Sequence, residues 1–270
     1  MCCYVCSMTA ARALPLAAAG HCTRDPLRGG LRMGLWLLPG LVLCSLSACS
    51  SAPTNHGEVK GENFHSRELL QSDSNRMATL AMKENLESLF LIMDKLYRRN
   101  PAEWKKTASS REAAMTYVRI AVMERQPWHE LQDKRDVAAL SLALQPEFAG
   151  DRVAAFVHAA ADMLITAHGG RTSFTLIDGL DPQHVFNAAR NLEIANWILN
   201  SRKAPGGKPL LLSNQIAEEG RNLSFEREMG KIIGRLDLVA DYTTERYRRS
   251  VIGYAQGLLA GPFMQFLPVR

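Results

Sequence analysis

The chain has 270 residues, of which 47% are hydrophobic and 22% are charged, and its formal net charge is +5. This length suits one domain with a substantial core. Four of the 32 basic and one of the 27 acidic residues precede Cys49, which leaves 28 basic and 26 acidic residues and a net charge of +2 from Cys49 onward. A balance this even excludes nucleic-acid binding argued from net charge.

The first 32 residues lack the pattern of a folded element. Cysteines crowd positions 2, 3 and 6, but a metal cluster there lacks a convincing fourth ligand, for which His21 is a poor choice. A more economical hypothesis is that translation starts further downstream and yields a short signal segment. The candidate starts are Leu27, Leu31 and Met33.

An uncharged apolar run, Gly34 to Leu46, follows two arginines and leads into Leu46-Ser47-Ala48-Cys49. The run is too short to cross about 30 Å of hydrocarbon, which needs roughly 20 residues. A basic start, an apolar middle and a small-residue end are typical of a secretory signal. The tetrapeptide resembles the lipobox of bacterial lipoprotein precursors. A plain secretory signal that happens to end in a cysteine is the alternative interpretation.

The resemblance implies that residues 1–48 are removed and that Cys49 carries the lipid that anchors the protein to the bilayer. In this family an Asp directly after the cysteine tends to retain the protein in the inner membrane. Ser50 stands there instead, which implies the outer membrane, with the domain facing the periplasm. No cysteine follows Cys49, so the mature chain cannot form an internal disulfide and its stability must come from its core.

Residues 49–65 have linker composition and no apolar period, and they predict a flexible tether. From Ser66 onward, apolar residues recur every three or four positions, which is the pattern of amphipathic helices. The predicted helices are a segment ending at Asn100-Pro101; one from the capping box Ser109-x-x-Glu112 to Arg125; a short one from Asp133 to before Pro146; one from Asp151 to His168, closed by Gly169-Gly170; one from Asp181-Pro182 to about Ser201; and one from Ser213 to Gly261-Pro262.

Two short runs, Phe174–Ile177 and Leu210–Leu212, are either strands or extended loops. Neither changes the fold class. Residues 66–270 are therefore predicted to form an all-α domain, a single bundle of about six helices that follows a signal peptide and a flexible tether.

Glu87 is a candidate catalytic residue because Glu87-Ser88-Leu89-Phe90 resembles a short element of lysozyme-like lytic transglycosylases, some of which are helical outer-membrane lipoproteins. The resemblance implies a general acid in a cleft. The family's later elements are missing, and Glu87 falls in the middle of a predicted helix beside its apolar stripe. A structural role is the alternative.

His158 and Asp162 are candidate metal ligands because a spacing of four residues places them on one helix face. Two ligands do not make a site, and a hydrogen bond between them on the helix surface is the simpler expectation. We expect neither a metal nor another cofactor.

Two basic-aromatic clusters, around Arg98-Arg99 and around Arg248-Arg249, could bind anionic lipid heads or glycan carboxylates. The alternative is a solvated helix face on which arginines pair with Asp94, Glu103 or Asp241.

The segment from Ser250 to Val269 carries no charge. We expect this segment to be the last core helix, with a face of glycines packed against a neighbouring helix. Phe263 and Phe266 would then belong to an apolar tail that covers the bundle or binds a partner. A second membrane element is the alternative.

Two functional classes remain. The first is a non-catalytic binding or scaffolding lipoprotein of the bacterial cell envelope, which positions another envelope protein. The second is a cell-wall enzyme with Glu87 as its general acid. The sequence contains no complete catalytic constellation, which favours the first.

Overall fold

The computed structural model describes residue 61 and residues 65–175, 178–217 and 220–264. The chain forms two compact units, Met1–Asn63 and Phe64–Arg270. The expected signal peptide and Cys49 belong to the first unit and lie outside the described residues.

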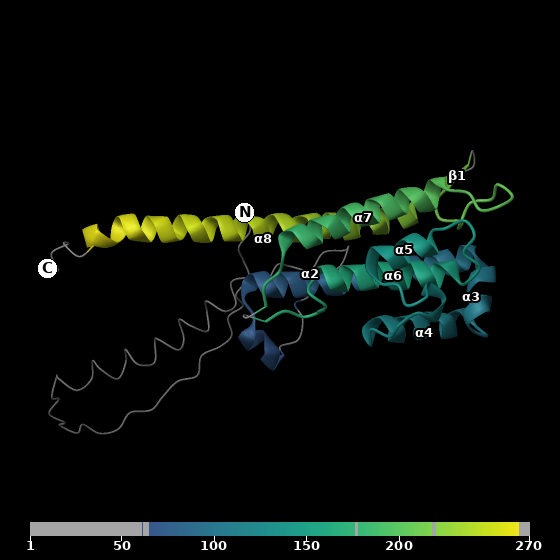
Figure 1. Cartoon of the computed structure of the whole chain (residues 1–270), viewed down its shortest axis with the longest axis horizontal. Coiled ribbons are helices and arrows are strands. Elements are labelled where there is room, and N and C mark those ends of the chain that lie inside the picture. The colour runs from purple at the N-terminus through teal and green to yellow at the C-terminus, as the bar shows by residue number, and fades with distance from the viewer. Residues whose placement is uncertain (1–60, 62–64, 176–177, 218–219, 265–270) are drawn as a thin grey trace, which may run out of the picture. The chain divides into compact units, whose positions relative to one another are not determined.

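The second unit is an all-α bundle, as predicted (Figure 1). The described α-helices are α2 (Asp73–Arg99), α3 (Pro101–Thr107), α4 (Arg111–Met123), α5 (Asp136–Ala143), α6 (Arg152–Ala167), α7 (Pro182–Ser201) and α8 (Ser224–Met264). The remaining described elements are two 3-10 helices, η1 (Ser66–Leu70) and η2 (His129–Leu131), and an antiparallel hairpin of β1 (Gln215–Ala217) and β2 (Gly220–Asn222).

Local capping chemistry sets several helix ends where the sequence predicts them. The side chain of Asp151 accepts a backbone N–H at the start of α6 at 3.0 Å, and Asp181 does the same for α7 at 2.8 Å, with Pro182 in the first turn. Gly169 and Gly170 follow α6 with φ values of +71° and +77°. Glycine adopts this left-handed conformation without steric cost, which explains the stop.

Other boundaries differ from the prediction. Ser110, not Ser109, caps α4 by accepting a backbone N–H at 3.1 Å. Helix α5 begins at Asp136, because Asp133 lies in the preceding loop with a left-handed φ of 58°. Pro101 ends α2 as predicted but also begins the short helix α3, where its missing N–H costs nothing.

The last helix begins later and ends later than the sequence predicts. The hairpin of β1 and β2 occupies the segment after Ser213, so α8 starts at Ser224. It then continues past Pro262 to Met264. Of the two runs that could be strands, Leu210–Leu212 lies in a loop, as do the described residues Phe174 and Thr175 of the other.

Helix α6 is the centre of the bundle. Every side chain from Arg152 to Ile165 is buried, whereas the sequence predicts one apolar face. Helices α2, α3, α4, α5 and α7 contact it. Small side chains allow them to approach on several sides, because the distance between packed helices depends on the residues at the contact. The alanines of α6 that are buried are Ala154, Ala155, Ala159, Ala160 and Ala161.

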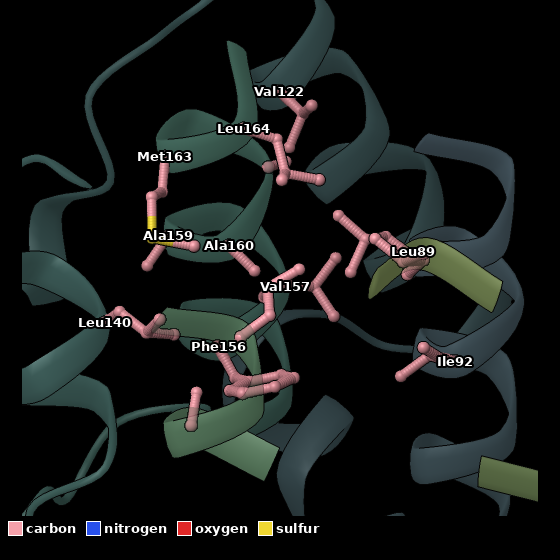
Figure 2. Close-up of a cluster of buried hydrophobic side chains, with 14 of the residues drawn as sticks. Leu89, Ile92, Val122, Leu140, Phe156, Val157, Ala159, Ala160, Met163 and Leu164 are labelled. Atoms are coloured by element: carbon pink, nitrogen blue, oxygen red, sulfur yellow. The ribbon is translucent and has the colours of Figure 1, made fainter. Parts of the chain in front are cut away.

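Figure 2 shows how neighbouring helices fill the space around α6. Val157 points toward Leu89 of α2, and Leu164 lies near Val122 of α4. Full burial of each such aliphatic side chain is worth about 1.5–3 kcal/mol relative to exposure. The core thus stabilises a unit whose sequence contains no cysteine and therefore no disulfide.

Helices α2 and α8 lie side by side and run in opposite directions. Arg235 donates to the hydroxyl of Ser88 at 3.0 Å, and Arg246, further along α8, donates to the hydroxyl of Ser74, near the start of α2, at 2.7 Å. As α8 advances, it therefore passes toward the beginning of α2.

Helix α7 has the same antiparallel relationship to α8. Asn196 donates to Glu226 at 2.6 Å, and Arg190, earlier in α7, donates to Asp237 at 2.7 Å. Because both pairs are antiparallel, the first residues of α2 and of α7 lie beside the same part of α8, in its C-terminal half.

Candidate interaction surface

Helix α8 extends beyond the start of both helices that flank it. Arg246 bonds to Ser74, one residue after α2 begins, and the Tyr247 hydroxyl donates to the carbonyl of Leu180, just before α7, at 3.4 Å. The remaining helix, residues 248–264, is about 26 Å long at 1.5 Å per residue. We call residues 248–264 the projecting segment; it is the yellow end of α8 in Figure 1.

Burial along α8 changes at this level. The side chains that pack on the bundle recur at helical spacing and end at Thr243, which is buried. From Thr244 to Leu258 every side chain is exposed, with exposed fractions of 70% for Val251, 73% for Tyr254 and 62% for Leu258. The sequence predicts that one apolar face of α8 stays packed to the end of the helix, and this is wrong. The flanking helices α2 and α7 begin beside Arg246 and Tyr247, so neither extends along the projecting segment.

The glycines of the projecting segment do not mediate close packing in the described part of the chain. A Cβ atom added at Gly253 or at Gly257 would have no other atom within 4 Å. The predicted contact of a glycine face with a neighbouring helix of the bundle is therefore wrong. The backbone on this face is open to an approaching partner.

The composition of the projecting segment is unusual for an exposed helix. Ser250 to Leu258 contains no charged residue, and its polar side chains are those of Ser250 and Gln256. Surface helices normally carry a charged face toward water, and helices that are apolar all round are normally buried. An exposed apolar surface of this kind is typical of an interaction site.

The two basic clusters lie far apart. Arg98 and Arg99 end α2, whereas Arg248 and Arg249 lie in the projecting segment, beyond the other end of α2. Because α2 and α8 are antiparallel, the clusters are at opposite ends of the pair and cannot form one site.

Local partners account for three of these arginines. Arg98 pairs with Asp94 at 2.8 Å, as expected for a solvated helix face. Arg99 donates to Gln215 at 3.3 Å. Arg248 donates through Nε to Glu245 at 2.7 Å, so its acidic partner is Glu245 and not Asp241.

Glu87 does not lie in the setting that a general acid requires. Its side chain is 53% exposed on α2 and forms an ion pair with Arg119 of α4 at 3.0 Å. Glu87 belongs to the surface of the bundle, and the apolar stripe of α2 lies on other faces of the helix. The geometry offers no support for catalysis at this position.

His158 and Asp162 are both buried, so the expected hydrogen bond between them on the helix surface is wrong. His158 Nε2 contacts the carbonyl of Gln126 at 2.9 Å. Asp162 accepts from Arg135 Nε at 2.9 Å and from Arg125 at 3.1 Å. The carboxylate that a metal would need is thus already bound to two guanidinium groups. Among the residues that the structure describes, no group of three or more metal-ligand side chains forms a site.

Asp162 organises a loop that sequence reasoning did not identify. The backbone N–H of Asp136 also donates to it at 3.1 Å. Burial alone would raise the pKa of Asp162, but the hydrogen bonds from Arg135 and Asp136 and the nearby positive charges lower it. The loop from Arg125 to Asp136 holds four non-glycine residues with left-handed φ between 53° and 58°. Such residues persist only where surrounding contacts fix them. Buried Asp162 contacts two of the four, since it accepts from the side chain of Arg125 and from the backbone N–H of Asp136.

A hollow of about 420 Å³ lies between α2 and α8 on the bundle. Five of its lining residues are apolar and four are charged; the lining residues are Asp73, Arg76, Met77, Leu80, Ala81, Glu84, Arg235, Leu238 and Val239. A second hollow of about 190 Å³ between α5 and α7 includes Val137 and Ile194, both of which are exposed. Neither hollow brings together the candidate residues of the sequence analysis.

Three predicted site residues are not placed by the structure. Cys49 and Phe266 lie outside the described residues, and Phe263 is described only as part of the backbone of α8.

Within the described part of the chain, no helix combines the length and mean hydropathy needed to cross a membrane. Comparison with protein-family models, curated proteins and solved structures finds no match to this chain.

Proposed function

We propose that this chain is a lipid-anchored helical module of the bacterial cell envelope, with a binding or scaffolding role and no catalytic one. In this proposal Cys49 carries the lipid, the domain faces the periplasm from the outer membrane, and the projecting segment of α8 is the binding surface. The partner is a protein of the same envelope.

The exposed, uncharged surface of the projecting segment is the observation that carries this proposal. Val251, Tyr254 and Leu258 place apolar side chains in solvent on a helix whose own bundle does not cover them. Contact with a protein would remove this apolar surface from water, which is favourable. The candidate catalytic carboxylate, Glu87, is instead exposed and paired with Arg119. Among the described residues, binding therefore has a candidate surface, whereas Glu87 lies in an exposed ion pair.

The binding role is tested by photo-crosslinking in intact cells that produce the full chain. A photoreactive phenylalanine analogue replaces Tyr254 in one variant and Tyr117 in the control. Tyr117 is also exposed, but it lies on α4. The proposal expects a discrete crosslinked protein product from position 254 and none from position 117. Equal labelling at the two positions, or none at either, would contradict it.

The anchor is tested separately by Cys49→Ala. Burial of acyl chains contributes about 0.8 kcal/mol per methylene, so more than one chain holds a protein on a membrane essentially permanently. The variant should appear in the soluble fraction or accumulate as unprocessed precursor, whereas Ser47→Ala serves as a matched control. If Cys49→Ala fractionates with membranes exactly as the unaltered chain does, the lipid is not the main attachment.

A further inference from the structure

We infer that the partner of the projecting segment is a second copy of this chain, bound antiparallel along the segment and centred on Tyr254. This inference rests on the proposed binding role of the same segment. It identifies the partner, and it predicts which residues face one another.

The face concerned continues an interface that already exists within the chain. Phe225, Met229, Ile232 and Leu236 pack α8 against the bundle. The apolar positions continue from Tyr247, at the edge of the bundle, to Val251, Tyr254 and Leu258, at separations of four, three and four residues. That spacing is the one by which side chains of paired helices interlock. The projecting segment thus carries a helix-pairing surface for which the described chain supplies no second helix.

The distribution of charge selects the antiparallel orientation. Arg246, Arg248 and Arg249 lie at the base of the projecting segment, whereas residues 250–264 carry no charge. In a parallel pair the arginines of the two copies would lie side by side and repel. In an antiparallel pair each basic turn lies beside an uncharged part of the other copy, and the two helix dipoles oppose one another favourably.

The distribution of side-chain size agrees with this orientation. With a two-fold axis beside Tyr254, Val251 of one copy lies opposite Gly257 of the other, and Tyr247 lies opposite Gly261. Large residues therefore meet glycines, where a second backbone has room, as the open space around Gly257 indicates. The two Tyr254 rings meet at the axis, where offset stacking of aromatic rings is favourable.

The length of the projecting segment also fits. In this register residue 264 of one copy lies opposite residue 244 of the other, where the run of exposed side chains on α8 begins. The pair therefore uses the whole projecting segment without requiring either bundle to open. One helix from each copy is a small interface, so we expect a dissociation constant on the order of micromolar.

A lipid surface is a poorer fit to the same residues. Helices that lie in a membrane interface carry charged residues along one face for their whole length. Here the charges are confined to Glu245, Arg246, Arg248 and Arg249, and the following turns have none on any face.

Cysteine crosslinking in cells that produce the full chain tests the inference. Because no cysteine follows Cys49, each introduced thiol in the domain is unique. Tyr254→Cys places two thiols at the axis, within the range of Cα separations that a disulfide spans. Gln256→Cys is the control, since it lies two residues on and about 200° round the same helix. Both positions are exposed and lie beyond the packed part of α8, so both variants should fold.

We expect oxidation to shift most of the Tyr254→Cys chain to the mass of a homodimer and to leave Gln256→Cys monomeric. Cells that produce Val251→Cys and Gly257→Cys chains together should give a mixed dimer, whereas neither variant alone should. Mass spectrometry of the product verifies that it contains two copies of this chain.

Two results would overturn the inference. A homodimer from Val251→Cys alone would indicate a parallel pair, and the absence of a homodimer from Tyr254→Cys would exclude pairing at this axis. In the second case the photo-crosslinking experiment separates the proposals. A product with a different protein at position 254 leaves the binding role standing, whereas lipid adducts alone, or no product, contradict both.

Discussion

The hydroxyl of Tyr97 donates a hydrogen bond of 2.7 Å to the carboxylate of Asp151, and both residues are buried. The same carboxylate accepts from Thr107 at 2.7 Å and from the backbone N–H of Ala154 at 3.0 Å. One side chain thus joins the end of α2, the end of α3 and the start of α6. Burial, together with the charge of Asp151, raises the pKa of Tyr97, and burial raises the pKa of Asp151.

Removal of the Tyr97 hydroxyl should therefore destabilise the bundle. Tyr97→Phe leaves a buried carboxylate with one donor fewer, which costs about 1–3 kcal/mol. Urea unfolding followed by circular dichroism measures this loss. Tyr117→Phe is the control and should change the unfolding free energy by less than about 0.5 kcal/mol, since it removes an exposed hydroxyl. Equal effects of the two substitutions would mean that the bond to Asp151 contributes nothing.

Arg152 fixes the segment between α5 and α6 without an acidic partner for its guanidinium. That group donates to four backbone carbonyls, of Ala143, Gln145, Pro146 and Phe148, at 2.6–3.2 Å. Arg152→Met leaves these acceptors unsatisfied and should cost about 3 kcal/mol or more of unfolding free energy.

The matched control for Arg152→Met is Arg202→Met, which removes an exposed arginine with one bond to a carbonyl, that of Leu144, at 3.1 Å. It should cost about 1 kcal/mol or less. Arg152→Lys should recover only part of the loss, because one ammonium cannot reach four carbonyls. Full recovery by lysine would show that charge, rather than the planar set of donors, is what matters.

Local chemistry explains which parts of the fold can be predicted from sequence. Asp151 and Asp181 cap helices through N–H groups two or three residues away, so their roles are visible in the sequence itself. The hydrogen bond from Tyr97 to Asp151 joins residues 54 positions apart. Periodicity identifies Tyr97 as part of an apolar stripe, but it cannot identify the partner of its hydroxyl.

The candidate site shows the same limit more sharply. The apolar period of α8 continues from Phe225 to Leu258, and periodicity alone predicts one packed face. Whether a residue of that face is buried depends on where α2 and α7 begin relative to α8. That alignment follows from tertiary contacts such as Arg246 to Ser74, which no spacing within α8 encodes. The exposed surface therefore emerges only from the structure.

Two buried histidines should make the stability of the bundle depend on pH. Burial lowers the pKa of His158 and of His168. Each therefore takes up its proton at a lower pH in the folded state than in the unfolded chain, where the pKa is about 6.5. The contribution of these histidines to the unfolding free energy is therefore complete above that pH. As pH falls toward the lowered pKa of the folded state, the contribution is lost, at up to about 1.4 kcal/mol per pH unit for each histidine.

Urea unfolding at several pH values between 5.5 and 7.5 tests this dependence. The double variant His158→Gln, His168→Asn keeps a side-chain donor for the carbonyls of Gln126 and Leu164 and should flatten the slope. The raised pKa values of Asp136 and Asp151 change the slope in the opposite direction, but they do so equally in the variant and in the unaltered chain. The difference between the two slopes therefore reports the histidines alone.

Gly150 lies against the carboxylate of Glu130, where a larger residue would meet that side chain. A Cβ atom there would lie 2.6 Å from the carboxylate of Glu130, which accepts from the backbone N–H of Asp151 at 3.1 Å and from Trp128 at 3.2 Å. Gly150→Ala must displace Glu130 and should cost about 1–3 kcal/mol through the two lost bonds. Gly179→Ala, where a Cβ meets open space, should be neutral or stabilising by about 0.4–1 kcal/mol. A neutral Gly150→Ala would show that Glu130 can move freely.

The projecting segment should contribute nothing to the stability of a single copy. The packed face of α8 ends at Thr243, and a side chain at Gly257 would meet no neighbour within 4 Å. Deletion of residues 250–270, and separately Gly257→Leu, should each change the unfolding free energy of dilute protein by less than about 0.5 kcal/mol. Leu236→Ala, in the packed part of the same helix, should cost about 2–5 kcal/mol and serves as the positive control. Urea unfolding at a protein concentration below that of any self-association provides the comparison. If the deletion costs as much as Leu236→Ala, the segment packs on its own bundle and the surface proposed for binding is not free.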